Sequence, residues 1–232
     1  MQSLLEYTQR DLATPDRGES QNGSYIDLYR YRILQVIADD IDHKMHDFAV
    51  SFLSGEEEEA SKQSVMLDEQ TSLVVRQTSR LGAFFTLLKV NEKQEPWAVL
   101  GTFRLLQLPD GSFNLHDRNV TDRKHGWGSV LLHTAERFVD RVTKHRQEGL
   151  LSANVGQEYL IDWFENRGYR PRDITELITI RNDVESGAII VGDAGYMYAK
   201  GTPKTKQLGP YSLPVFSRRL ILQKIFRKHE GQ

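Results

Sequence analysis

The spacing of apolar residues changes along the chain and predicts different elements in its successive parts. From Tyr25 to Leu53 apolar residues recur every three or four positions, which places them on one face of a long helix. The polar stretch before it, Thr14 to Ser24, contains Pro and Gly and predicts a loop. Ser54 to Gln70 contains a run of Glu residues, whose mutual repulsion predicts a solvated loop or a frayed helix.

Three segments that follow have the composition of strands. Leu81 to Val90, Trp97 to Leu106 and Ser112 to Val120 are rich in β-branched and aromatic residues, and turn-forming residues separate them. The second connection, Leu108 to Gly111, has Pro and Gly where a tight hairpin needs them. The pattern therefore predicts an antiparallel meander of three strands.

The helical period returns after Gly128, with a stripe that would pack on the sheet: Leu131, Ala135, Phe138 and Val142. A short apolar run, Leu150 to Val155, predicts a strand. An amphipathic helix is expected from Gln157 to Asn166, and Gly168 is suited to close it.

The last part of the chain predicts two strands and one helix. One strand is expected over Ile174 to Ile180, and the other over Ala188 to Val191, continued by Gly195 to Ala199. Phe216 to His229 combines apolar and basic residues and predicts a basic amphipathic helix. Such a helix could dock on its own domain, or it could contact an anionic membrane, a nucleic acid or a partner subunit.

Composition narrows the class of protein. The chain has 232 residues and a formal net charge of -2, so its overall charge does not indicate a nucleic-acid or membrane protein. Cys is absent, which excludes disulfides, thiolate metal ligands and a Cys nucleophile. The His residues show no ligand spacing, so no metal is expected. With neither a signal peptide nor a run of about 18 apolar residues, we expect a soluble cytoplasmic protein.

The turn Arg123-x-x-Gly126-x-Gly128 lies between a predicted strand and a predicted helix. The unpaired N–H groups and the positive dipole end of a helix start can bind a diphosphate, and glycines let a large anion approach the backbone. The turn matches neither the dinucleotide fingerprint nor a Walker loop. Taken alone, it could equally be a glycine-rich turn that only reverses the chain.

A second segment of the sequence favours the binding site over a simple chain reversal. The turn from Arg123 to Gly128 resembles motif A of the GNAT superfamily of N-acetyltransferases, and Trp163 to Tyr169 resembles a later stretch of that family. The resemblance covers Leu81 to Ala199. It implies an α+β fold with a mixed, mostly antiparallel, splayed sheet flanked by helices. The acyl-CoA-binding catalytic core would be residues 71–200, between an N-terminal helical region, 1–70, packed on it, and a C-terminal tail, 201–232, with the basic helix.

The resemblance also implies a co-substrate, acetyl-CoA or another acyl-CoA, and a binding segment for it. The pantetheine arm would lie along the backbone of Arg118, Asn119 and Val120. The pyrophosphate would lie at the turn and helix start formed by Arg123, Lys124, His125, Gly126, Trp127, Gly128, Ser129 and Val130.

Transfer to an amine needs a base, because a Lys-like amine with a pKa of about 10.4 is almost fully protonated at neutral pH. His116 and Asp117 precede the turn, and strand alternation lets at most one of them face the site. In this resemblance Phe164 occupies the place where many family members have a Tyr that protonates the leaving thiolate. Tyr159, Tyr196 or Tyr198 could replace it.

The sequence thus supports an N-acyltransferase, with acetyl the simplest acyl group, acting on an amine of a small molecule or a protein. The alternative is a catalytically weak acyl-CoA-binding module with a role in regulation or assembly. Phe164 supports this alternative, because a phenyl ring cannot donate a proton to the leaving thiolate. A third reading is an acyltransferase with an unusual acceptor or acyl chain. A homodimer is also possible in each case.

Overall fold

The computed structural model describes most of the chain after residue 40. The described residues are 41, 43–53, 62–79, 82–121, 126–144, 148–192, 195–201, 205–208, 211–214 and 218–227. They fall into two compact units, the first made of Met1–Leu151 with Ile225–Gln232 and the second of Ser152–Lys224. No helix among the described residues is long and apolar enough to cross a membrane. The predicted loop from Thr14 to Ser24 lies outside the described residues.

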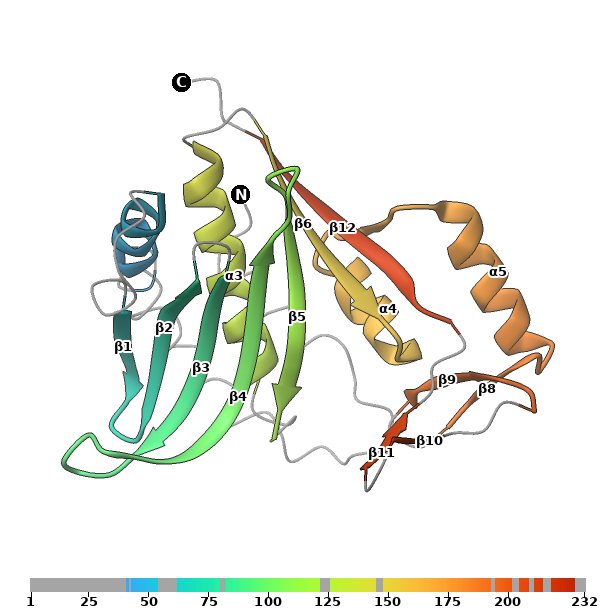
Figure 1. Ribbon diagram of the computed structural model, residues 1–232, viewed down its shortest axis with the longest axis horizontal. Coiled ribbons are helices and arrows are strands. Elements are labelled where there is room, and N and C mark those ends of the chain that lie inside the picture. Colours follow the sequence, from blue (N-terminus) through green and yellow to red (C-terminus); the bar gives the residue numbers. More distant parts are fainter. Residues whose placement is uncertain are drawn as a thin grey trace, which may run out of the picture. The chain divides into compact units, whose positions relative to one another are not determined.

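The first unit contains an antiparallel meander whose strands pair in chain order (Figure 1). Its strands are β1 (Lys62–Asp68), β2 (Thr71–Ser79), β3 (Gly82–Val90), β4 (Pro96–Gln107) and β5 (Phe113–Val120). The three strands expected from the sequence are confirmed as β3, β4 and β5. The hairpin between the last two has Gly111 at φ 82°, as its turn residues predicted.

β1 corrects the expectation of a loop or frayed helix over Ser54 to Gln70. Within this strand Val65 and Leu67 are buried, and the residues on either side of them are exposed or half-buried. That alternation stabilises a strand, because one face of it meets the core and the other meets solvent. The run of Glu residues precedes this strand and does not extend into it. β2 was not expected either.

One face of the meander is covered by α3 (Trp127–Lys144), which lies behind the strands in Figure 1. The expected helix after Gly128 is therefore confirmed. Phe138 of α3 lies at the centre of an aromatic cluster, with ring centroids 5.2 to 6.2 Å away; its partners are Phe48, Phe52, Phe85 and Phe113. Phe48 and Phe52 belong to a helix over residues 43–53, the described part of the long helix that the sequence predicts.

The second unit contains short helices and strands. Its elements are α4 (Glu158–Glu165), β7 (Arg170–Pro171), α5 (Ile174–Glu185), β8 (Ile189–Val191), β9 (Met197–Ala199), β10 (Thr205–Leu208) and β11 (Tyr211–Pro214). β6 (Glu148–Val155) and β12 (Leu220–Arg227) each contribute residues to both units. β8 pairs with β9, and β10 pairs with β11. The expected elements β6 and α4 are confirmed, and so is the α+β class with a mostly antiparallel sheet flanked by helices. The strand expected over Ala188 to Val191, continued by Gly195 to Ala199, is instead two strands that pair antiparallel, because the chain reverses between them.

α5 corrects the expectation of a strand over Ile174 to Ile180. The Asp173 carboxylate caps the helix, because it accepts hydrogen bonds from the backbone N–H of Thr175 at 2.8 Å and from its hydroxyl at 2.6 Å. Leu177 and Ile180 are buried one turn apart. The β-branched composition indicated a strand, but the cap and the three-residue step of the buried positions determine a helix.

β12 corrects the expectation of a basic amphipathic helix over Phe216 to His229. Leu220 and Leu222 are fully buried, two residues apart, which is the strand period. Leu222 pairs with Pro171 and Gln223 with Arg170 of β7. Pairing with a strand distant in the sequence decided the conformation, and the segment alone does not reveal that partner.

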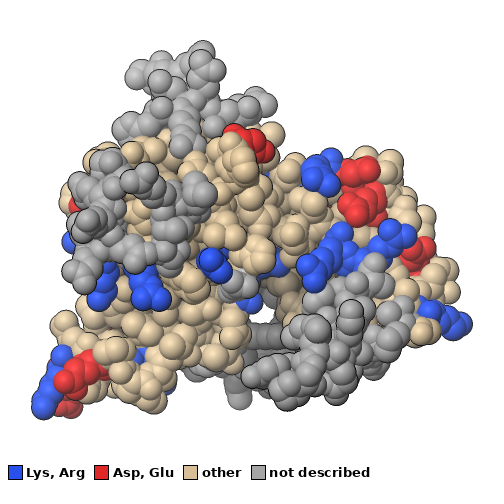
Figure 2. Space-filling model, in the orientation of Figure 1, with Lys and Arg blue, Asp and Glu red and all other residues tan. Residues whose placement is uncertain are grey.

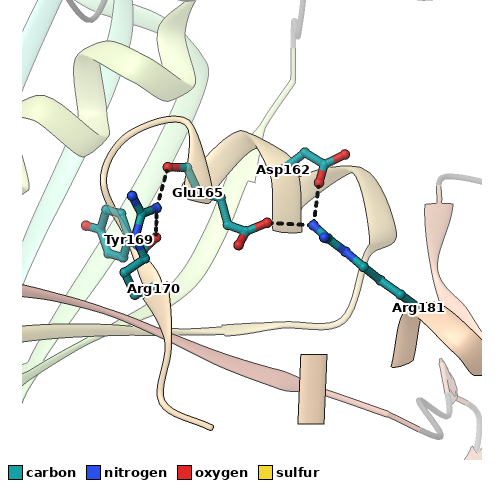
Figure 3. A network of polar contacts seen from close by, with 5 residues as sticks. All are labelled: Asp162, Glu165, Tyr169, Arg170 and Arg181. Carbon is teal, nitrogen blue, oxygen red and sulfur yellow. Dashed lines mark hydrogen bonds and ion pairs between the residues drawn. The ribbon is translucent and has the colours of Figure 1, made fainter. Parts of the chain in front are cut away.

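Ion pairs and hydrogen bonds hold α4 and α5 of the second unit together (Figure 3). The Arg181 guanidinium contacts the Asp162 carboxylate at 3.3 Å and the Glu165 carboxylate at 2.8 Å. Arg170 donates from Nη1 to the carbonyl oxygens of Glu165 and Tyr169, at 3.3 and 3.1 Å. Arg181 therefore ties α4 to α5, and Arg170 holds the turn that follows α4.

Candidate functional site

Gly126 lies at the helix start that the sequence predicts to bind a diphosphate. Its φ is +69°, a backbone conformation that other residues rarely adopt. Its carbonyl oxygen accepts from the N–H groups of Ser129 at 3.0 Å and Val130 at 3.2 Å, so it is the residue that caps α3. A Cβ atom built on Gly126 would have no heavy atom within 4 Å. This position therefore needs glycine for its backbone angle, and it borders open space.

The electrostatics of this helix start favour an anion. None of the residues from Trp127 to Val130 is acidic. The first N–H groups of a helix lack intrahelical acceptors and carry the positive end of the dipole. Thr121 anchors the chain before the turn, because its N–H and its hydroxyl both donate to the Leu100 carbonyl oxygen at 2.9 Å. The strand that precedes the 18-residue helix α3 in the chain is thus fastened to its neighbour at its end.

The predicted pyrophosphate residues lie in different environments. Trp127 and Gly128 are half-buried, whereas Ser129 and Val130 are buried on the core side of α3. Arg123, Lys124 and His125 lie outside the described residues. The described part of the segment therefore offers backbone N–H groups at an exposed glycine rather than a cluster of side chains.

The predicted residues of β5 lie at or near a bulge that the sequence does not reveal. His116 pairs with Arg104 and Asn119 pairs with Thr102, and the register shifts between these two pairs. Thr102 and Arg104 share one face of β4, so Asn119 lies on the face of His116 and not, as strand alternation predicts, on that of Asp117. The backbone of Asp117 belongs to β5, and its side chain is outside the described residues.

His116 and Asn119 are exposed, while Arg118 and Val120 are half-buried. The exposed imidazole of His116 is thus reachable from solvent on the face of the meander opposite α3. The role of His116 as a base stays a prediction. The role of the β5 backbone as a pantetheine site also stays a prediction.

The proposed substitutes for the family Tyr lie in the second unit. Tyr159 is 41% exposed and packs on Gly195, where an added Cβ would lie 2.5 Å from Cδ1 of the ring. Tyr198 is buried in β9, as a packing residue would be. A catalytic role for Tyr159 stays a prediction.

The second segment of the resemblance is a packed turn. Phe164 is fully buried, and its ring centroid lies 4.8 Å from that of Trp163 and 4.9 Å from that of Tyr169. Arg167 is also buried, with its guanidinium carbon 4.0 Å from the centroid of the Trp163 ring and Nη1 donating to the Trp163 carbonyl oxygen at 2.8 Å. Gly168 follows at φ +84° and closes the helix. Core packing accounts for each of these residues.

No protein-family model matches this chain, and no curated protein matches it. Solved structures do. A putative N-acetyltransferase from Lactobacillus plantarum is 16% identical, with 64% of this chain and 72% of that one covered and a TM-score of 0.35. An IAA acetyltransferase from Bacillus cereus is 11% identical, with 63% and 79% covered and a TM-score of 0.36.

A GNAT family acetyltransferase from Elizabethkingia anophelis with acetyl-CoA bound is 11% identical, with 63% of this chain and 76% of that one covered and a TM-score of 0.35. Similarities at these TM-scores carry no argument about what this chain binds or does.

Proposed function

We propose that this protein is an N-acyltransferase that moves an acyl group, acetyl in the simplest case, from acyl-CoA to an amine. The observation that carries the proposal is Gly126, which caps an 18-residue helix in a left-handed conformation and borders open space. Gly187 and Gly201 also combine a positive φ with open space, and Gly126 differs from them because it lies at the start of a long helix. The matching motif order of the sequence supports the same conclusion.

The coenzyme would bind at this helix start through its pyrophosphate. The N–H groups of Trp127 and Gly128 lie at the positive end of α3, and the absence of a Cβ on Gly126 lets the anion approach them. Arg123, Lys124 and His125 would add positive charge. The backbone from Arg118 to Val120 would hold the pantetheine arm.

When bound, the coenzyme supplies an activated acyl thioester for attack by the amine. The chain must remove a proton from that amine, and His116 is an exposed imidazole on the strand that leads to the turn. Asp117 is the alternative base. A backbone N–H of β5 would stabilise the negative charge that develops on the carbonyl oxygen.

A general acid is not essential to this chemistry. The thiol of the leaving group has a pKa near the ordinary thiol value of about 8.5, so its thiolate leaves without much help at neutral pH. Phe164 can therefore serve the core of its own unit without abolishing transfer. Tyr159 stays the candidate if an acid is used.

Replacing Gly126 by Val tests the coenzyme site, and Gly187 offers a matched control. Both glycines have positive φ, +69° and +73°, and a Cβ on either would have no heavy atom within 4 Å. Backbone strain is thus alike in the two variants. We expect Gly126→Val to weaken coenzyme A binding by about tenfold or more, equivalent to about 1.4 kcal/mol, in isothermal titration calorimetry, and Gly187→Val to leave affinity unchanged. Equal affinities in both folded variants would refute the assignment.

A catalytically weak acyl-CoA-binding module is the second candidate, because Phe164 places a buried phenyl ring where many family members have Tyr. Thiol release during incubation with acetyl-CoA and a broad panel of amines separates the two. Turnover that falls in the His116→Gln variant supports the enzyme. Tight coenzyme binding without release from any amine supports the module.

A further inference from the structure

A row of side chains crosses the open face of the meander in the first unit. The register aligns Lys62 with Arg76, Arg76 with Phe84, Phe84 with Arg104 and Arg104 with His116. One residue of the row comes from each strand from β1 to β5. We call these five residues the cationic row, since three of them are permanent cations and His116 becomes one on protonation.

The cationic row lies on the face opposite α3. The residues that follow Arg76, Phe84 and Arg104 along their strands are buried: Gln77, Phe85 and Leu105. Phe85 packs against Phe138 of α3. Lys62, Arg76 and His116 are exposed, and Phe84 and Arg104 are half-buried. Figure 2 views this face, and blue Lys and Arg side chains lie across it in the first unit.

Phe84 orients the two arginines beside it. The guanidinium carbon of Arg76 lies 5.7 Å from the centroid of the Phe84 ring, and that of Arg104 lies 5.9 Å from it. Both distances are within the range of a cation–π interaction. The ring therefore holds two guanidinium groups over a shared surface, which reduces the entropy that each loses when it binds an anion.

The dimensions of the row suit an extended chain. Neighbouring strands lie about 4.8 Å apart, so the row is about 19 Å long from Lys62 to His116. An extended peptide of about six residues has that length at about 3.3 Å per residue. On one side of the row the paired positions Val74, Thr86 and Thr102 carry no charge.

We propose that the cationic row binds an acidic peptide segment in an extended conformation. Each guanidinium has five N–H donors, so Arg76 and Arg104 can donate to a carboxylate while they keep their existing contacts, which include Phe84. Nucleic acid fits less well for two reasons. The Phe84 ring is engaged by guanidinium groups and not open for base stacking, and the chain has a net charge of -2, unlike a typical nucleic-acid-binding domain.

Binding of a fluorescein-labelled oligoglutamate of about ten residues, long enough to cross the row, tests this inference by fluorescence anisotropy on the full chain. We expect Arg76→Gln to weaken binding about fivefold and Arg76→Gln with Arg104→Gln to weaken it by about tenfold or more, since each partly exposed pair is worth up to about 1 kcal/mol. Raising the salt concentration should weaken binding as well.

Lys89→Gln is the matched control. Lys89 is a cation on the same meander, but its Nζ lies 5.4 Å from the centroid of the Trp97 ring, outside the row. Its replacement should leave affinity unchanged. Circular dichroism establishes that each variant is folded, and Arg76→Lys should retain most of the affinity because it keeps the charge.

Three results would overturn the inference. One is the absence of peptide binding at low salt. Another is an equal loss in Lys89→Gln, which would mean that any surface cation suffices. The third is tighter binding of a single-stranded oligonucleotide of the same charge, lost in the Arg76→Gln variant. None of these measurements uses coenzyme A, so their outcome is independent of the proposed enzymatic function.

Discussion

The two segments that resemble the same family differ in what surrounds them. At the start of α3, Gly126 is exposed and an added Cβ would meet nothing within 4 Å. In the turn after α4, Phe164 and Tyr169 are fully buried and Arg167 is nearly so. Both segments use a glycine with positive φ, Gly126 at +69° and Gly168 at +84°.

Two segments that both resemble the family in sequence therefore meet different physical requirements in the structure. The Gly126 turn leaves backbone donors beside open space, as a ligand site requires. The turn after α4 fills its space with its own rings, as a structural core requires. Mutations should therefore affect binding in the first segment and stability in the second.

The largest effect is expected from Phe164→Ala. Its fully buried ring contacts the rings of Trp163 and Tyr169, and removal of such a ring costs about 3–5 kcal/mol through lost burial and the cavity that remains. Urea denaturation measures this loss. Phe164→Leu should cost much less. A Phe164→Ala variant as stable as the parent would mean that this turn is not a packed core.

Phe164→Tyr restores the residue that many family members have, and it should still be harmful. The new hydroxyl would enter a site packed by aromatic rings, and an unsatisfied buried hydroxyl costs about 1–3 kcal/mol. We expect a lower free energy of unfolding and no faster thiol release from acetyl-CoA. A faster rate in the variant would instead indicate that position 164 faces the thioester.

Gly126→Ala and Gly168→Ala separate backbone strain from ligand space. Each places a Cβ in the left-handed region, which costs about 1–2 kcal/mol of stability in both segments. Only Gly126→Ala should also weaken coenzyme A binding. Thermal unfolding and calorimetry provide the two readings, and a similar loss of affinity in both variants would remove the distinction between the segments.

Arg181→Gln should have a smaller effect on the second unit. Its guanidinium contacts Asp162 and Glu165, but its side chain is 53% exposed, so solvent screens both ion pairs. Pairs of this kind contribute about 0.2–1 kcal/mol. Denaturation at low and high salt should show a loss that shrinks with added salt, and a salt-independent loss would contradict an electrostatic origin.

The smallest effect concerns pH and the cap of α5. Hydrogen bonds from Thr175 lower the pKa of the Asp173 carboxyl below its ordinary value of 3.8. Because the folded pKa is the lower one, the stabilisation is present above that ordinary value and is lost as the pH falls through the folded pKa. Asp173→Asn should therefore reduce the dependence of Tm on pH in acid. An unchanged pH profile would show that the cap is not ionised or not formed.

Much of the fold was predictable from the sequence. The periods of apolar residues correctly placed β3, β4, β5, α3, β6 and α4, because each of these elements has enough buried positions to show its own repeat. The turn at Gly126 was predictable for a similar reason, since a glycine at a helix start has a local role. These features depend on residues that are close together in the chain.

The remaining features depend on partners that are distant in the sequence. β12 is a strand through its pairing with β7, although its own residues are consistent with a helix. The bulge in β5 moved Asn119 to the face of His116. The cationic row exists only because the register of five strands aligns one residue from each. The sequence by itself determined the elements with a strong local period and the glycine turn; the tertiary structure alone decided which side chains meet across strands, because register is a property of the pairing and not of either strand.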